Sequence, residues 1–137
     1  MKKNGFTLIE AVLTLSVLAV GIMGVLALYQ QNIAKAAEME QTLVATELAQ
    51  EKLEQIILDK KYKLYPFITA ANYTSPENLT AQGFPGYTRT TTILEVDPSN
   101  MVSAQSGSGY KKVTVSVAIA GGLTVTLDTL VTLWGES

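Results

Sequence analysis

The sequence predicts an α+β fold in which one long N-terminal helix packs on a small antiparallel β-sheet of three to four strands. The helix should be transmembrane in its first half and amphipathic in its second. Three observations favour this fold class. An uncharged apolar run near the N-terminus continues into a stretch without Pro or Gly, a turn-rich region follows, and the C-terminal third holds three runs of β-branched and apolar residues.

The first expected element is an apolar helix long enough to cross a membrane. Residues 11–28 carry no charge, and their only polar side chains are those of Thr14 and Ser16. A run of about twenty apolar residues spans the hydrocarbon core of a bilayer as a helix. Lys2 and Lys3 precede the run, and positive charge on that side predicts a cytoplasmic N-terminus with the remainder exported.

The helix is expected to continue beyond the membrane to about Leu58. Residues 29–58 contain no Pro or Gly and consist mostly of good helix formers. Pro66 disfavours helical geometry at Tyr65, so the helix should end in this region. Apolar residues recur at three- and four-residue steps and should share one face, which is typical of an amphipathic helix. They are Leu43, Val44, Leu48, Ala49, Leu53, Ile56 and Ile57.

The remaining sequence predicts a connecting loop followed by the sheet. Residues 59–86 are rich in Pro, Gly, Asn and Ser toward their end and should form a long loop with at most one short element. Gly121-Gly122 fits a tight two-residue hairpin turn. The apolar stripe of the helix should cover the apolar face of the sheet. Three strand-like runs are expected, at residues 87–96, 110–120 and 123–134.

The composition argues against several classes of function. The chain has neither Cys nor His, so disulfides, thiolate zinc sites and histidine bases are excluded. Its formal charge of −2 and the lack of a large basic cluster argue against nucleic-acid binding. The oxygen-bearing run Asp97, Ser99 and Asn100 is interpreted as an ordinary turn rather than a calcium site. We therefore expect no enzyme activity, no cofactor and no metal.

Glu10 is unexpected because it is an acid at the threshold of the apolar run. One interpretation is a cleavable secretory signal with Ala34-Lys35-Ala36 as its cleavage site, although the apolar run is longer than such signals usually have. Another is a permanent single-span anchor in which Glu10 favours the positive end of the helix dipole. The residues alone leave both interpretations open.

The segment Gly5-Phe6-Thr7-Leu8-Ile9-Glu10, followed by the apolar helix, resembles the N-terminal signature of type IV pilins and of type II secretion pseudopilins. The resemblance implies that a prepilin peptidase cleaves after Gly5 and methylates the new amino group of Phe6. It also implies that the Glu10 carboxylate pairs with the Phe6 amine of an adjacent subunit. Gly21 and Gly24 resemble a small-residue packing notch between helices.

The resemblance also implies a domain organisation and a location. Residues 1–5 would be a cytoplasmic leader, 6–28 the transmembrane and assembly helix, and 29–137 a periplasmic or extracellular pilin domain. Within that domain we expect an amphipathic helix, an αβ-loop and a β-sheet, at residues 29–58, 59–86 and 87–134. The protein would cross the bacterial inner membrane once, with its N-terminus in the cytoplasm, before it enters a periplasmic or extracellular filament.

The run VLAVGIMGVLALYQQNIAKA, followed by LAQEKLEQI, most resembles minor pilins of the PilV type and is somewhat similar to the minor pseudopilins of type II secretion. The implied function is a structural subunit that primes or modifies a type IV pilus-like filament. A minor pseudopilin of a type II secretion system is the first alternative, and a single-span membrane-anchored binding domain is the second. The implied partners are other pilins or pseudopilins, the prepilin peptidase, the inner-membrane assembly machinery and, before assembly, membrane lipid.

Overall fold

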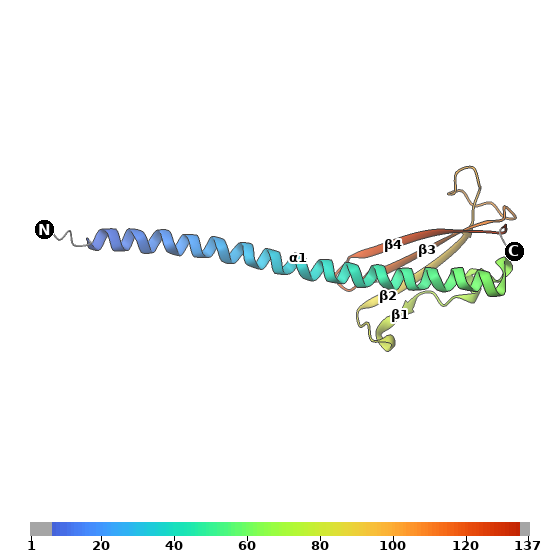
Figure 1. Ribbon diagram of the computed structural model, residues 1–137, viewed down its shortest axis with the longest axis horizontal. Helices are drawn as coiled ribbons and strands as arrows, with labels where there is room; N and C mark the ends of the chain where they lie inside the picture. Colours follow the sequence, from blue (N-terminus) through green and yellow to red (C-terminus); the bar gives the residue numbers. More distant parts are fainter. Residues whose placement is uncertain (1–6, 135–137) are drawn as a thin grey trace. The chain divides into compact units, whose positions relative to one another are not determined.

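The computed structural model describes residues 7–134, and its longest element is the helix α1 (Leu8–Lys63) (Figure 1). The chain divides between Glu40 and Gln41 into two compact units, and α1 runs through both. The predicted long helix is thus confirmed, although its expected start at Phe6 lies outside the described residues and it continues to Lys63, beyond the expected end at about Leu58 and into the predicted 59–86 loop. Three lysines in its last turn suit the negative end of the helix dipole. The helix ends where Leu64 adopts a φ of 69° ahead of Pro66.

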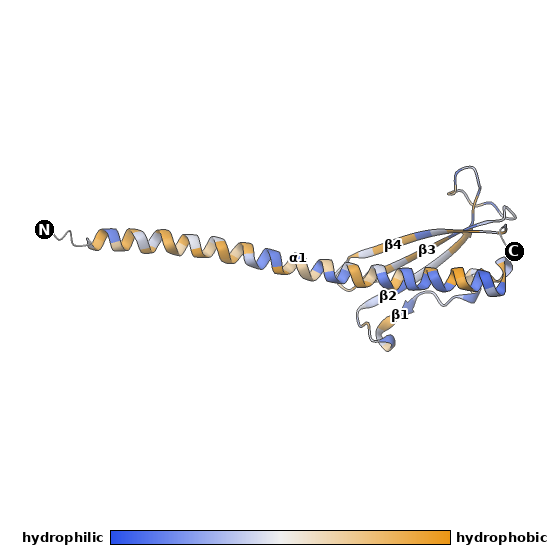
Figure 2. Cartoon of the chain, viewed as in Figure 1, coloured by the Kyte–Doolittle hydropathy of each residue, from blue (hydrophilic) through white to orange (hydrophobic). Residues whose placement is uncertain are grey.

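Between Ala11 and Leu28 in the first unit, α1 carries apolar side chains on all sides, with Thr14 and Ser16 as its only polar residues. Figure 2 shows mostly hydrophobic residues along the N-terminal part of the helix, whereas hydrophilic residues are frequent on α1 in the second unit. A helix that is apolar all round is typical of a membrane span or of a helix buried in a large protein.

The second unit contains a four-stranded antiparallel sheet in the order β1-β2-β3-β4. The three predicted strands are present, and a short strand β1 joins the edge of β2 through the pair Glu77↔Arg89. Val115 of β3 lies opposite Thr91 of β2 and Leu127 of β4. The strands are β1 (Glu77–Asn78), β2 (Tyr87–Glu95), β3 (Tyr110–Ile119) and β4 (Thr124–Thr132).

The core of this unit lies between α1 and one face of the sheet, as the sequence predicts. Side chains from the helix, the 65–79 segment and β3 form one buried cluster. Its fully buried members include Ile56, Leu79, Val113, Val115 and Val117.

The predicted apolar stripe of the helix is partly wrong. Leu43 and Ile57 are 60% and 49% exposed, whereas Ala45 and the charged Lys52 are buried. The three- and four-residue spacing placed Leu43 and Ile57 within the apolar stripe. The sheet covers a narrower arc of the helix than that stripe, so both side chains lie outside the core. Lys52 is buried because it has a carboxylate partner, which the helical periodicity does not reveal.

Two further expectations need correction. The segment after α1 holds more structure than one short element, because three short 3-10 helices accompany β1: Tyr65–Phe67, Ala70–Asn72 and Leu79–Gln82. The connection between β3 and β4 has three residues rather than two. The N–H of Ile119 donates to the Leu123 carbonyl oxygen, which leaves Ala120, Gly121 and Gly122 in the loop. Both glycines have positive φ, as such a turn requires.

Candidate functional site

Glu10 lies in the first turn of α1, where its side chain is exposed. The N–H groups of Glu10 and Ala11 donate to the Thr7 carbonyl oxygen at 3.1 and 3.2 Å and so close the first turn. The hydroxyl of Thr14 donates to the Glu10 carbonyl oxygen at 2.7 Å. The carboxylate is therefore favoured by the positive end of the helix dipole, and it has no ion-pair partner among residues 7–134.

The helix that follows Glu10 keeps its apolar side chains exposed. Leu13, Val17, Ile22 and Val25 are each more than half exposed. The segment is also long and apolar enough to cross a membrane, and none of its most apolar window is buried within the protein. Because no part of the described chain covers these side chains, lipid or another protein has to do so.

Gly21 lies at the centre of a shallow apolar groove along this helix. The groove is lined by residues at helical spacing, among them Thr14, Leu18, Ile22 and Val25. A Cβ added at Gly21 or at Gly24 would meet no atom within 4 Å. Glycine in a helix interior costs about 1 kcal/mol relative to alanine, and none of the described residues of this unit lies close enough to require glycine at either position. The described chain therefore leaves room for close approach of another helix at Gly21.

The predicted site residues do not form one cluster. Glu10 and the two glycines lie on the same helix more than two turns apart. Gly5 and Phe6, where processing was predicted, lie outside the described residues. The structure thus supplies an exposed carboxylate and an exposed apolar helix that follows it.

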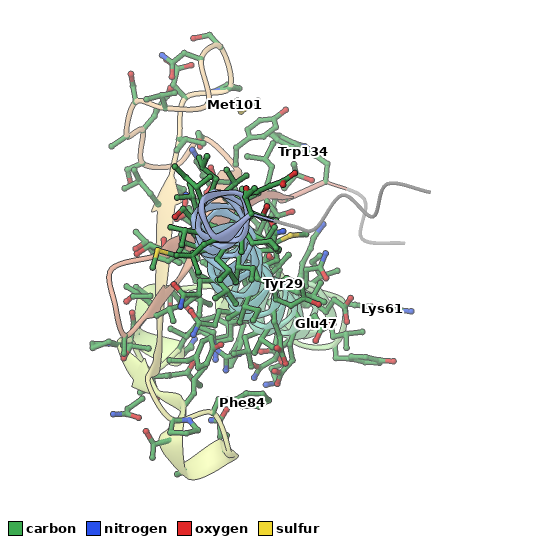
Figure 3. The ribbon with its side chains drawn as sticks, turned by 90° about the vertical axis from the view of Figure 1, so that its left-hand side faces the viewer. Tyr29, Glu47, Lys61, Phe84, Met101 and Trp134 are labelled. Atoms are coloured by element: carbon green, nitrogen blue, oxygen red, sulfur yellow. The ribbon has the colours of Figure 1, made fainter. Side chains whose placement is uncertain are left out.

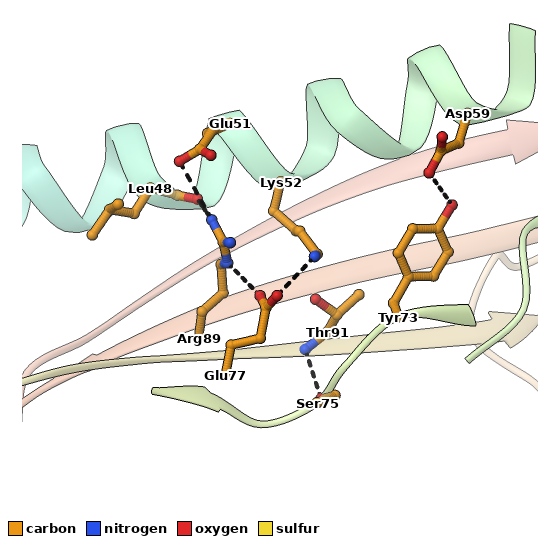
Figure 4. A network of polar contacts seen from close by, with 9 residues as sticks. All are labelled: Leu48, Glu51, Lys52, Asp59, Tyr73, Ser75, Glu77, Arg89 and Thr91. Carbon is orange, nitrogen blue, oxygen red and sulfur yellow. Dashed lines mark hydrogen bonds and ion pairs between the residues drawn. The ribbon is translucent and has the colours of Figure 1, made fainter. Parts of the chain in front are cut away.

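The second unit holds a buried charged cluster that the sequence analysis did not identify (Figure 4). The Glu77 carboxylate accepts from Arg89 Nε at 2.8 Å and from Lys52 Nζ at 3.1 Å. The Arg89 guanidinium also donates to the carbonyl oxygen of Leu48 in α1 at 2.9 Å, and it lies 3.5 Å from Glu51. The cluster therefore ties β1 and β2 to the helix.

The electrostatics of this cluster follow from opposing effects. Burial alone would raise the pKa of Glu77, but the hydrogen bonds from Arg89 and Lys52 outweigh burial and lower it. Both oxygens of the carboxylate are paired with cations that are themselves buried, so the cluster is satisfied within the described chain and holds its elements together. Its only signal in the sequence is an Arg in a strand whose neighbours are mostly Thr.

A second polar contact holds the loop against the helix (Figure 4). The Tyr73 hydroxyl donates to Asp59 of α1 at 3.1 Å, and Asp59 also pairs with Lys63 at 2.8 Å. The pKa of Asp59 is lowered, chiefly by its hydrogen bond with Lys63. Burial raises the pKa of the Tyr73 hydroxyl, and its bond to Asp59 raises it further. The loop between α1 and β2 is therefore anchored to the helix at two places.

The opposite side of α1 in this unit faces solvent. The side chains of Glu47 and Lys61 extend away from the sheet (Figure 3), and both are exposed. Among the described residues, no group of three or more His, Cys, Asp or Glu side chains is placed to hold a metal ion.

Comparison with known families gives one match. Residues 1–26 match the family model described as the prokaryotic N-terminal methylation motif. The match covers Gly5, Phe6, Glu10, Gly21 and Gly24, and it ends within the apolar helix. Comparisons with curated proteins and with solved structures found no match. The chain therefore carries a type IV pilin-like N-terminal signal in front of an α+β domain.

Proposed function

We propose that this chain is a structural subunit of a type IV pilus-like filament, a minor pilin that primes or modifies assembly. One observation carries the proposal: the matched methylation motif leads directly into a helix whose apolar side chains have no cover within the described chain. The match extends into the apolar helix itself, and the structure adds that no part of the described chain covers the side chains of that helix.

The proposal assigns a role to each residue of the signal. A prepilin peptidase cleaves after Gly5, which removes Lys2 and Lys3, and the amino group of Phe6 is then methylated. Before assembly, the apolar part of α1 anchors the subunit in the inner membrane. During assembly, inner-membrane machinery moves it into a filament with other pilins, where neighbouring helices replace lipid around α1.

Glu10 sets the position of the subunit relative to its neighbour. An unpaired acid at the centre of a membrane helix costs about 2.5 to 3.5 kcal/mol on insertion scales, so a carboxylate in the filament core needs a cation. The Phe6 amine of an adjacent subunit supplies that cation. Apolar packing contributes most of the cohesion. In a filament surrounded by water, it is favoured by about 25 cal/mol for each Å² of apolar surface kept from water. Exchange of lipid for a neighbouring helix gains van der Waals packing instead.

The deciding experiment is the intact mass and N-terminal sequence of the protein recovered from membranes of its own host. A chain that begins at Phe6 with one added methyl group supports the proposal. A start at Ala37 would show a secreted soluble domain instead, and an uncut Met1 would show a simple anchor. Either of these results would overturn the filament proposal.

A variant then tests the role of Glu10. Glu10→Ala should remove the protein from sheared filaments while it stays processed and membrane-bound, because the Phe6 amine of its neighbour loses its partner. Glu47→Ala is the matched control, since Glu47 is an exposed acid on the same helix in the second unit and should leave incorporation unchanged. Normal incorporation of Glu10→Ala, with partner binding intact, would favour a membrane-anchored binding domain.

The choice between a pilus and a type II secretion pseudopilus depends on the partners, since both use the same N-terminal helix chemistry. Deletion of the gene in its host distinguishes them. Loss or shortening of surface pili with normal secretion supports a minor pilin. Loss of protein secretion with normal pili would instead show a minor pseudopilin.

A further inference from the structure

A second hollow lies on the helix just beyond the membrane segment. It is lined by Tyr29, Asn32, Ile33 and Ala36. These residues stand at positions i, i+3, i+4 and i+7 of α1, which is the set of four residues that forms a hole for the side chain of a facing helix in a coiled coil. Both Tyr29 and Ile33 are more than 60% exposed, so the hole is open.

The hollow belongs to a seam with a seven-residue repeat. Taking Tyr29 and Ala36 as a positions makes Asn32 and Met39 d positions. Continued toward the N-terminus, the same frame places Ile22 at a and Val25 at d, and both of these line the groove around Gly21. All six side chains lie on one face of the first unit, and each is exposed.

The charges beside the seam fit a parallel partner in the same register. In this frame Lys35 is a g position and Glu40 is the following e position, five residues later. In a parallel two-stranded coiled coil, a g residue of one helix pairs with the following e residue of the other. Both side chains are exposed, and neither has an ion-pair partner among the described residues.

We propose that residues 22–40 of α1 pair with the same residues of a second copy of this chain as a parallel, in-register two-helix coiled coil. Copies inserted in one membrane with the same orientation are necessarily parallel, and this point rests on the membrane anchoring in the proposed function. Lys35 of each copy then faces Glu40 of the other. Asn32 meets Asn32, and its amide both donates and accepts a hydrogen bond.

Asn32 explains why the partner is a second copy rather than an arbitrary apolar helix. A polar residue at an a position of a coiled coil costs stability but specifies register and oligomer state, and we expect Asn32 to act in the same way at d. Against an apolar partner the Asn32 amide would be desolvated without a hydrogen bond, whereas the same residue of a second copy satisfies it. The pairing therefore selects identical chains at equal height in the membrane.

Single cysteines test the pairing directly, because the chain contains no native Cys. Ala36→Cys places a thiol in the seam, and Ala34→Cys, two residues away, places one on the opposite side of the helix. After mild oxidation of host membranes, Ala36→Cys should give a disulfide-linked product of twice the monomer mass, several-fold more than Ala34→Cys. Equal yields, no product at Ala36→Cys, or a product of another mass would overturn the proposal.

The charge pair is tested on the Ala36→Cys background. Lys35→Glu and Glu40→Lys should each lower the yield of linked dimer several-fold, because each places like charges together. The double exchange Lys35→Glu with Glu40→Lys should restore it. Failure of the double exchange to restore the yield would contradict the pairing of Lys35 with Glu40.

The same membranes separate this inference from the proposed function. Intact mass reports whether the chain begins at Phe6. A processed chain without the Ala36→Cys dimer would overturn the coiled coil alone. An unprocessed chain that still forms the dimer would overturn the filament proposal and leave the coiled coil in place.

Discussion

The two parts of α1 are equally helical, yet they differ in the exposure of their apolar side chains. Ile22 in the first unit is 54% exposed, whereas Ile56 in the second is fully buried against the sheet. The helix therefore serves two purposes. Its second part holds the domain together, and its first part presents apolar surface that no part of the described chain covers.

The difference teaches how to separate folding from assembly in this protein. Substitutions in the second unit should change the free energy of unfolding of the domain. Substitutions in the first unit should leave that free energy unchanged and act only on membrane insertion or assembly. Each prediction below concerns the full chain in detergent, with unfolding followed through the fluorescence of Trp134, the only Trp in the sequence.

The largest expected effect is that of Arg89→Ala. The substitution leaves the Glu77 carboxylate with one of its two cations and removes the donor to the Leu48 carbonyl oxygen, so it should cost about 3 to 5 kcal/mol of unfolding free energy. Lys112→Ala is the control, because its pair with Asp128 is largely exposed and should contribute at most about 1 kcal/mol. Equal losses for the two variants would contradict the structural role of the buried cluster.

The next largest effect on the unfolding free energy is expected for Ile56, with Ile22 as its exposed counterpart. Ile56→Ala should lower the unfolding free energy by about 2 to 5 kcal/mol, because it opens a cavity in the core. Ile22→Ala should change it by less than about 0.5 kcal/mol, as is usual for an exposed position. A comparable loss for Ile22→Ala would mean that the first part of the helix contributes to the fold of the domain.

A smaller effect is expected for Tyr73→Phe. The substitution removes the hydroxyl that donates to Asp59 but keeps the buried ring, so denaturant unfolding should show a loss of about 1 kcal/mol. Tyr62→Phe is the control, since Tyr62 is 75% exposed and should have no measurable effect. If the two variants unfold alike, the bond to Asp59 does not anchor the loop.

The smallest effect is the dependence of stability on pH through Glu77, because burial opposes the hydrogen bonds that lower its pKa. A carboxyl group whose pKa is lower in the folded than in the unfolded chain stabilises the fold above the unfolded value, here about 4.5. This contribution should be lost as the pH falls below 4.5 and through the folded pKa. Glu77→Gln should show a shallower loss over that range, and an unchanged slope would contradict the assignment.

The sequence by itself determined the regular elements. The absence of charge between Ala11 and Leu28, the absence of Pro and Gly from Tyr29 to Leu58 and the alternation in β3 predict a long helix and an antiparallel sheet. These signals are local, because they depend on side-chain periodicity and backbone propensity within one element. The signature around Glu10 is likewise a matter of residue identity and spacing, and the family match on residues 1–26 confirms its type.

Only the tertiary structure decided which helix residues are buried and how the loop is held. Lys52 and Arg89 are buried because each reaches Glu77, which lies far from both in the sequence. The short strand β1 exists because β2 offers an edge for it to pair with. These features depend on contacts between residues distant along the chain, and neither propensity nor periodicity records such contacts.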